Sequence, residues 1–359
     1  MYRFKLVVLV LALALALALT SSASAQDLSD EERKDGFVSM FNGKDFTGWR
    51  FSGGKKDELP KNWAVADGLI RLSGGGSPHL ASEWDYEDFD VRLQWKAHKK
   101  GYNSGFYVRS GRSVNANQIN LAQNDCGHLL GGPKEAKAVP ELQKEPGEWN
   151  DWRVLAIGSK LTFWANGKMA WEINSFKPSR GYLGLQAEGH AVDFKNIRIK
   201  ELGYESLNDL AKWAGSAGTT IKAEGEGEGE AIAVEGKQAQ MVTKKAYKNY
   251  VLRLEYKTDK IGTLRLGFRN ALMHSLRDAK KDAAKSAEHP AGQWNYLELR
   301  VQNNRSAVWL NGVWLWEDEP LPQAAAESCV GLGNTAEEHL VFRNLRIKDL
   351  EDLPKDQKK

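Results

Sequence analysis

Three short segments of this chain carry amide, carboxyl and guanidinium side chains at two-residue spacing. In a β-strand, side chains two positions apart lie on the same face. The three sets are Asn103 with Tyr107 and Arg109, Gln118 with Asn120, and Gln186 with Glu188. Planar amides and arginine make paired hydrogen bonds to neighbouring hydroxyl groups, and an aromatic ring covers the apolar face of a sugar. The pattern predicts a polar groove suited to an oligosaccharide or glycoside.

Each of these side chains also has a purely structural interpretation. Gln118 and Asn120 can satisfy backbone groups at a turn or a sheet edge. Arg109 can form a structural ion pair, because Arg269 stands at the matching place in the second half of the chain. Both interpretations stay open at the level of the sequence.

The elements that must position these residues are short strands. The 359 residues include 34 glycines, 13 tryptophans and 10 prolines, a mixture typical of strands joined by tight turns. A hydrophobic fraction of 42% excludes disorder as the main state. The 50 lysines and arginines nearly balance 47 acidic residues, which excludes a dedicated nucleic-acid binder.

The first 25 residues have the pattern of a secretory signal peptide. Arg3 and Lys5 precede an apolar run over 6–19, and Ala23-Ser24-Ala25 has the small-x-small form of a cleavage site. The run is shorter than the roughly 20 residues that span a bilayer, which favours cleavage over an uncleaved anchor. We expect an exported bacterial protein, periplasmic, cell-surface or secreted, without a membrane span after cleavage. Cys126 and Cys329 lie in non-equivalent places and are expected to be independent thiols.

The chain contains a tandem duplication. Residues 147–172 match 292–317 at a constant offset of 145, and VDFKNIRIKEL at 192–202 matches LVFRNLRIKDL at 340–350. Repeats of roughly 160 residues are long enough to be domains with their own cores. The predicted organisation is a linker at 26–36, sandwiches at 37–202 and 206–350, and a polar tail at 351–359.

Each half is predicted to be a β-sandwich. In DVRLQWK, at 90–96, apolar and polar residues alternate, as in a strand with one buried face. Asp67-Gly68, Asn166-Gly167 and Asn311-Gly312 are hairpin signals. The alternation slips at Asn196 and again at Asn344, which predicts a bulge in each copy. The helical segment 277–288 is interpreted as a surface insertion, and the Glu-Gly alternation at 224–230 as an acidic loop.

The duplication also sorts the tryptophans. Six of them recur in pairs and are expected to pack in the cores: Trp149, Trp164 and Trp171, with Trp294, Trp309 and Trp316. Trp84 and Trp152 lack aromatic counterparts, so they are the candidates to stack on a sugar. By the same reasoning, NSGFYVR at 103–109, which the second copy lacks, belongs to a site in the first copy.

An ordered series of motifs over 37–202 resembles a known family. FVSMFNGKDFTGW, WAVADGLI, YEDFDVRLQW, NSGFYVR, the stretch Gln118 to Leu121, GEWNDW, WANG, GLQAEG and VDFKNIRI together resemble the 3-keto-disaccharide hydrolase domain family. The resemblance implies tandem concanavalin A-like jelly-roll sandwiches, an all-β fold, of which the second is degenerate. It also implies export in bacteria and cleavage of glycosides oxidised to a ketone at sugar carbon 3.

This chemistry needs a base, an acid and a group that holds an enolate. The ketone acidifies the hydrogen on carbon 2, so a base can remove it while the aglycone leaves from carbon 1, and water then adds back. Arg109 suits the enolate, and Glu188 and His190 are candidates for base and acid, although all three can be ordinary structural or solvated residues. Asp125 and His128 form a further pair.

The chain departs from the family pattern at two positions. Many members carry acidic residues two places before and three places after the glutamine, where this chain has Ala116 and Leu121. A non-catalytic, lectin-like protein therefore stays open beside the hydrolase. The sequence requires no cofactor and leaves open both a divalent cation and the oligomeric state.

Overall fold

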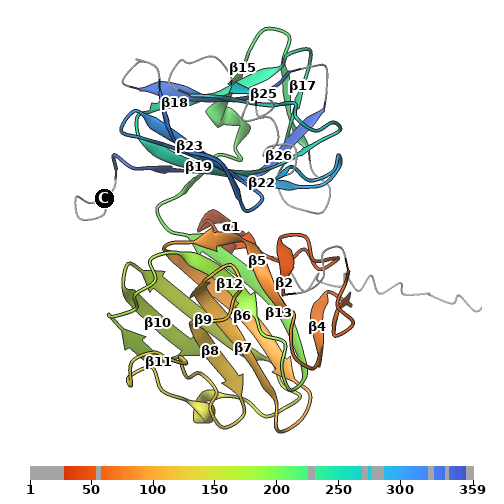
Figure 1. Cartoon of the computed structure of the whole chain (residues 1–359), viewed down its shortest axis with the longest axis vertical. Coiled ribbons are helices and arrows are strands. Elements are labelled where there is room, and N and C mark those ends of the chain that lie inside the picture. The colour runs from red at the N-terminus through yellow and green to blue at the C-terminus, as the bar shows by residue number, and fades with distance from the viewer. Residues whose placement is uncertain are drawn as a thin grey trace, which may run out of the picture.

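The computed structural model describes residues 28–53, 58–224, 231–268, 274–275, 287–321, 327–335 and 339–352. The chain there is almost entirely antiparallel β, in two sandwiches that follow one another along the long axis (Figure 1). Each sandwich pairs an eight-stranded sheet with a five-stranded one, which confirms the predicted tandem all-β fold. The proposed signal peptide, the Glu-Gly loop after Glu224 and most of the 277–288 segment lie outside the described residues.

The first sandwich is formed by β1 to β13. Its large sheet has the order β11-β10-β9-β6-β13-β4-β3, with β1 also on β13. These strands are β1 (Val38–Ser39), β3 (Trp63–Ala66), β4 (Leu69–Gly74), β6 (Phe89–Ala97), β9 (Asn150–Ile157), β10 (Lys160–Ala165), β11 (Lys168–Ile173) and β13 (His190–Glu201). The small sheet has the order β2-β5-β12-β7-β8. Its strands are β2 (Trp49–Ser52), β5 (His79–Tyr86), β7 (Asn103–Ser110), β8 (Gln118–Ala122) and β12 (Gly181–Leu185).

The second sandwich repeats this plan. Its large sheet has the order β16-β17-β26-β19-β22-β23-β24, with β14 also on β26. These strands are β14 (Glu205–Ser206), β16 (Thr220–Glu224), β17 (Ala231–Glu235), β19 (Tyr250–Thr258), β22 (Asn295–Gln302), β23 (Arg305–Leu310), β24 (Val313–Pro320) and β26 (Leu340–Asp349). The small sheet comprises β15 (Trp213–Gly215), β18 (Gln240–Tyr247), β25 (Ser328–Asn334), β20 (Leu264–Gly267) and β21 (His274–Ser275).

The predicted hairpins and bulges are present. Asn166 and Asn311 have φ of 51° and 48°, each followed by a glycine with positive φ, so both turns have the twist that suits a two-residue hairpin. The register of β13 on β6 shifts between Lys195 and Arg198, around Asn196. The matching shift in the second copy lies beside Asn344. Local sequence therefore set these turns and bulges.

The segment predicted as a linker contains a short helix, α1 (Asp30–Lys34). Ser29 caps it, and Glu32 completes the capping box. Glu32 also accepts a 2.6 Å hydrogen bond from Arg198 and lies 3.5 Å from Arg92, both on the large sheet. The helix is thus tied to the first sandwich. Two other short turns are 3-10 helices, at Pro140–Leu142 and Leu210–Lys212.

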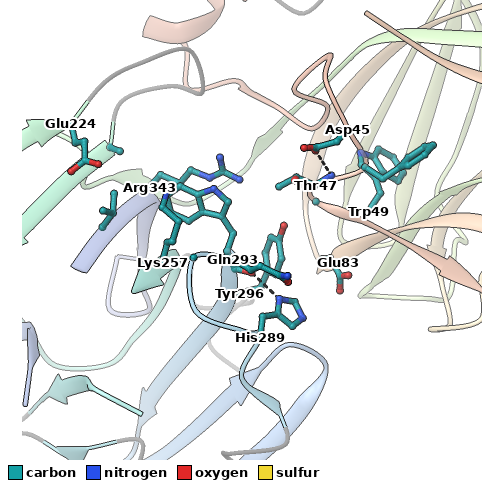
Figure 2. Close-up of a pocket in the computed structure, with 16 residues that line it drawn as sticks. Asp45, Thr47, Trp49, Glu83, Glu224, Lys257, His289, Gln293, Tyr296 and Arg343 are labelled. Carbon is teal, nitrogen blue, oxygen red and sulfur yellow. Dashed lines mark hydrogen bonds between the residues drawn. The ribbon is translucent and has the colours of Figure 1, made fainter. Parts of the chain in front are cut away.

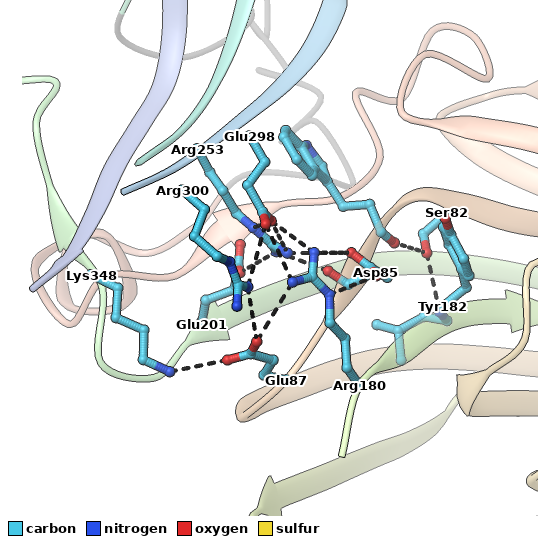
Figure 3. A network of polar contacts seen from close by, with 12 residues as sticks. Ser82, Asp85, Glu87, Arg180, Tyr182, Glu201, Arg253, Glu298, Arg300 and Lys348 are labelled. Carbon is cyan, nitrogen blue, oxygen red and sulfur yellow. Dashed lines mark hydrogen bonds and ion pairs between the residues drawn. The ribbon is translucent and has the colours of Figure 1, made fainter. Parts of the chain in front are cut away.

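The two sandwiches meet through a buried polar and aromatic interface. Arg253 of β19 donates at 2.7 Å to Glu201 of β13 and at 2.8 Å to Glu298 of β22. Arg180, from the first sandwich, donates at 2.7 Å to both Asp85 and Glu298 (Figure 3). The side chains of Arg253 and Glu298 are each 1% exposed. Because buried charges must be paired to be tolerated, this network fixes one relative position of the two sandwiches.

Candidate functional site

The candidate site lies on the outer face of the five-stranded sheet of the first sandwich. Phe106, Ile119 and Leu185, one on each of three strands, point into the core. The side chains that alternate with them along these strands therefore point outward. Gln118 and Gln186 stand on that outward face and are hydrogen bonded to one another across β12, β7 and β8. The strands β12, β7 and β8 lie in the lower sandwich of Figure 1. The predicted convergence of the three polar segments is therefore present.

A row of hydrogen bonds runs across this face. The Gln118 amide donates to Gln186 Oε1 at 2.9 Å and to Asn120 Oδ1 at 3.3 Å. Asn120 in turn donates to Asp125 Oδ2 at 2.7 Å. Gln186 also hydrogen bonds the Tyr107 hydroxyl, on the strand between them. The amides thus link neighbouring strands into one polar unit.

The row ends in an Asp–His pair. His128 Nδ1 lies 3.1 Å from Asp125 Oδ1, and Asp125 also holds Asn120. Their side chains are 36% and 42% exposed, so the pair faces solvent. With Nδ1 held by the carboxylate, Nε2 of His128 is the nitrogen available to a ligand. From the sequence, Asp125 and His128 were predicted only as a further candidate pair, after Glu188 and His190.

Tyr107, Gln118 and Asn120 are more buried than predicted. They are 3%, 7% and 8% exposed, respectively. Val114, in the loop between β7 and β8, packs against Tyr107. The Gln118 side chain also fills the space beside Gly105, where a Cβ would lie 2.3 Å from its amide nitrogen. These side chains therefore position the exposed groups more than they offer surface to a ligand.

His79, at the start of β5, was missed by the sequence analysis. Its Nδ1 accepts the backbone N–H of Ala187 at 3.1 Å, and its ring lies 5.5 Å from the Tyr107 ring. Burial lowers the pKa of His79, which keeps it neutral with its proton on Nε2. A lone histidine at a strand end has no motif around it, so only the fold could reveal its place.

Glu188 lies two residues beyond Gln186, just after β12, whereas His190 belongs to a different sheet. Burial, together with the negative charge of Glu188, raises the pKa of Tyr107 to about 12. His190 begins β13 and pairs with Gly74, and its ring faces Gly101. Asn103, half-buried, lies against the backbone of Gly189 between these two residues.

The predicted role of Arg109 at an enolate is wrong. Its side chain has no exposed surface, and its nitrogens donate to Glu87 O, Gly158 O, Pro178 O and Asp88 Oδ1 at 2.6 to 2.9 Å. A φ of 42° and a register shift between β7 and β12 break the alternation here and turn Arg109 away from the polar face. Arg109 is a structural residue that joins loops of the first sandwich.

The two tryptophans predicted to stack on sugar are also structural. Trp152 is 0% exposed and packs edge-to-face on Trp95 and Phe163 in the core. Trp84 is 4% exposed because its ring stacks on Trp309 of the second sandwich, with centroids 5.3 Å apart. Neither ring is available to a ligand.

The described residues hold no group of three or more His, Cys, Asp or Glu side chains that could hold a metal ion. In the same part of the chain, no helix is long and apolar enough to cross a membrane. Cys126 is buried and Cys329 is exposed, and both are free thiols, as expected.

Comparison with known proteins places the chain in a family. It is 25% identical, over 232 residues, to a 3-keto-disaccharide hydrolase of Bacteroides thetaiotaomicron, a match that spans 47% of this chain and 79% of that protein. It is 26% identical to a candidate glycosyl hydrolase of Parabacteroides distasonis, whose crystal structure aligns with a TM-score of 0.40 over 49% of this chain and 99% of that one. A carbohydrate-binding module of Bacillus subtilis aligns at 16% identity with a TM-score of 0.34, over 43% of this chain and 96% of the module. The sequence model of the 3-keto-alpha-glucoside-1,2-lyase-like domain matches residues 36–200 and 271–348, so the chain belongs to that family.

Proposed function

We propose that the first sandwich binds a 3-keto-glycoside on its polar face and releases the aglycone by elimination and hydration. The observation that carries the proposal is the hydrogen-bonded row from Gln186 through Gln118 and Asn120 to the Asp125–His128 pair, with Glu188 two residues beyond Gln186. Membership of the lyase-like family and the relationship to a 3-keto-disaccharide hydrolase support the substrate class.

Glu188 is the proposed base and His128 the proposed acid. β12, which precedes Glu188, is separated from β8, which precedes His128, by two strand spacings, or about 10 Å, enough to hold a sugar ring between them. The Glu188 carboxylate removes the proton from carbon 2, and the carbon 1–oxygen bond breaks as His128 Nε2 gives a proton to the leaving oxygen. Asp125 stabilises the protonated imidazole.

Hydration then reverses the two roles. His128 takes a proton from water as its oxygen adds to carbon 1, and Glu188 returns the proton to carbon 2. The products are the free 3-keto sugar and the aglycone, and both side chains regain their starting protonation states. Tyr107 stays protonated because its pKa is raised to about 12, and its buried side chain helps to hold Gln186 in place.

The test is release of a chromophore from a 3-keto-glucoside, with the unoxidised glucoside as a second substrate. We expect release from the keto sugar only, and a loss of kcat of about 10²-fold or more in Glu188→Gln and in His128→Asn. Glu148→Gln and His98→Asn change the same residue types elsewhere on the first sandwich and are the matched controls.

Two results would reject the proposal. Equal release from the unoxidised glucoside would show an ordinary glycosidase. Saturable binding of the keto sugar without release, by a folded protein, would instead support the lectin-like alternative.

We also propose that the protein is exported. The basic start, the apolar run over 6–19 and the small-x-small site at 23–25 support this. Expression in a bacterium, followed by fractionation and mass spectrometry, should find a mature chain that begins at Gln26 outside the cytoplasm. A full-length chain retained in the cytoplasm would contradict it.

A further inference from the structure

A cavity lies between the two sandwiches, away from the polar face described above. It has a volume of about 540 Å³, within the range of small-ligand sites. The first sandwich contributes the turn 45–49 and Glu83, and the second contributes His289, the segment 292–294 and Lys257 (Figure 2). We propose that this cleft binds an uncharged saccharide, independently of the elimination proposed for the first sandwich.

The aromatic residue of interest in the cleft lining is Trp294. The Arg343 guanidinium lies 3.9 Å from the ring centroid and is 8% exposed, whereas Trp294 itself is half-buried. Trp294 and Arg343 both line the cleft, and part of the half-buried Trp294 side chain remains exposed. An indole ring held in this way is a platform for the apolar face of a pyranose.

Polar groups line both sides of the cleft. Figure 2 shows Glu83 and His289 on opposite walls, and Gln293 also lines the cleft. His289 Nδ1 donates to the backbone oxygen of Trp294 at 2.8 Å, which leaves Nε2 for a ligand. Burial raises the pKa of the Glu83 carboxyl, and no side chain among the described residues hydrogen bonds to it. A carboxyl, an amide and an imidazole in one cleft are the donors and acceptors that sugar hydroxyls need.

The charges in the cleft favour a neutral ligand. Arg343 is paired with Glu255 at 2.8 Å, and Asp45 accepts hydrogen bonds within its own turn from Asn42 and Thr47. Glu83 and Lys257 line the cleft from the two different sandwiches, and Glu224 lies 2.8 Å from His339, so neither sign of charge dominates the lining. An anion or a strongly cationic ligand would find no matching field there.

The cleft is preformed. Its two walls are joined by the Arg253 network and by the stacked pair Trp84–Trp309. A ligand therefore does not have to bring the sandwiches together, and less binding free energy is spent on ordering the protein.

The first copy supplies an internal control. Trp149 occupies the position equivalent to Trp294, with Lys195 at 4.1 Å and Lys96 at 4.9 Å from its ring. Lys257 lies at the same 4.9 Å from Trp294. Trp149 does not line the interdomain cavity. The two rings thus share their cationic neighbours and differ in whether the other sandwich faces them.

The experiment is ¹⁹F NMR of the full chain labelled with 5-fluorotryptophan, titrated with maltose and with cellobiose. Trp294→Phe and Trp149→Phe assign the two resonances. At least one of the two sugars should shift the Trp294 resonance saturably and leave the Trp149 resonance in place. Calorimetry should show that Trp294→Ala weakens the affinity by about tenfold or more and that Trp149→Ala leaves it unchanged.

The outcomes separate this proposal from the elimination chemistry. His128→Asn should lose release from the 3-keto-glucoside and keep the Trp294 shift, whereas Trp294→Ala should keep release. No saturable shift with either sugar would overturn the proposal. Equal shifts at Trp149 and Trp294, or calorimetric binding that survives Trp294→Ala unchanged, would also overturn it.

Discussion

The Trp84 ring of the first sandwich stacks on the Trp309 ring of the second, with centroids 5.3 Å apart and planes 29° from parallel. Tyr296 meets the same Trp84 ring edge-on at 5.9 Å, and the Arg253 guanidinium lies 5.0 Å from it. The two copies of the duplication thus share a mixed aromatic and ionic core. This makes the second sandwich a structural partner of the first and one wall of the interdomain cleft.

Trp84→Ala should lower the free energy of unfolding by about 3 to 5 kcal/mol, because it removes a fully packed indole from the interface. We further expect one unfolding transition in the wild type and two in the variant, because each sandwich keeps its own core. Differential scanning calorimetry measures both effects. The exposed Trp314, at 40%, is the control, and Trp314→Ala should change stability by less than about 0.5 kcal/mol. A single unshifted transition in Trp84→Ala would contradict the prediction.

Arg253→Ala should destabilise the protein by roughly 3 to 5 kcal/mol, because it removes the buried cation shared by Glu298 and Glu201 and leaves them with Arg180 and Arg346 alone. Arg71→Ala breaks the exposed ion pair with Asp67 and should cost less than about 1 kcal/mol. Urea unfolding of both variants beside the wild type measures the difference. Similar small losses in the two variants would show that the interface network is not coupled to folding.

The Glu298 carboxyl should make stability depend on acid pH. Although burial alone would raise its pKa, Arg253 and Arg180 hold it well below the ordinary value of 4.5. Its contribution to the free energy of unfolding is present above the pKa of the unfolded state. This contribution is lost as the pH falls from about 5 towards the lower pKa of the folded state. The free energy of unfolding should fall over pH 5 to 3 in the wild type, and less steeply in Glu298→Gln. The control Glu148→Gln should retain the wild-type slope.

Glu83 should act in the opposite sense. Burial raises its pKa above the ordinary 4.5, so folding favours the protonated form, and this contribution is lost as the pH rises through the folded pKa. Glu83→Gln, which stays neutral, should be more stable than the wild type at pH 8 and equal to it near pH 4. Thermal unfolding at the two pH values tests this, and a variant less stable at pH 8 would contradict it.

Arg109→Met should destabilise the first sandwich by roughly 3 kcal/mol or more, because four acceptors lose a buried donor. The protein that remains folded at low temperature should keep a kcat on the 3-keto-glucoside within a few-fold of the wild type. Circular dichroism and initial rates on the same samples separate the two effects. A stable variant that has lost activity would restore Arg109 as a catalytic candidate.

The amino-acid sequence by itself determined the local architecture. Asn-Gly and Asp-Gly pairs set the hairpins, and the alternation of apolar residues set the strands and their faces, because both depend on neighbours in the chain. The offset of 145 residues revealed the duplication, and two-residue spacing brought Gln118, Asn120 and Gln186 to one face. These features need no knowledge of which strands pair.

Only the tertiary structure decided which polar and aromatic residues are exposed. A positive φ and a register shift turned Arg109 away from its predicted face, and the second sandwich buried Trp84. Of the recurring tryptophans, Trp171 packs in the core as expected, whereas Trp294 lies half-exposed in a cleft. His79 and His128 gained their places through partners on other strands or in a loop. The exposure of a residue depends on what packs against it from distant parts of the chain, and local periodicity does not predict those contacts.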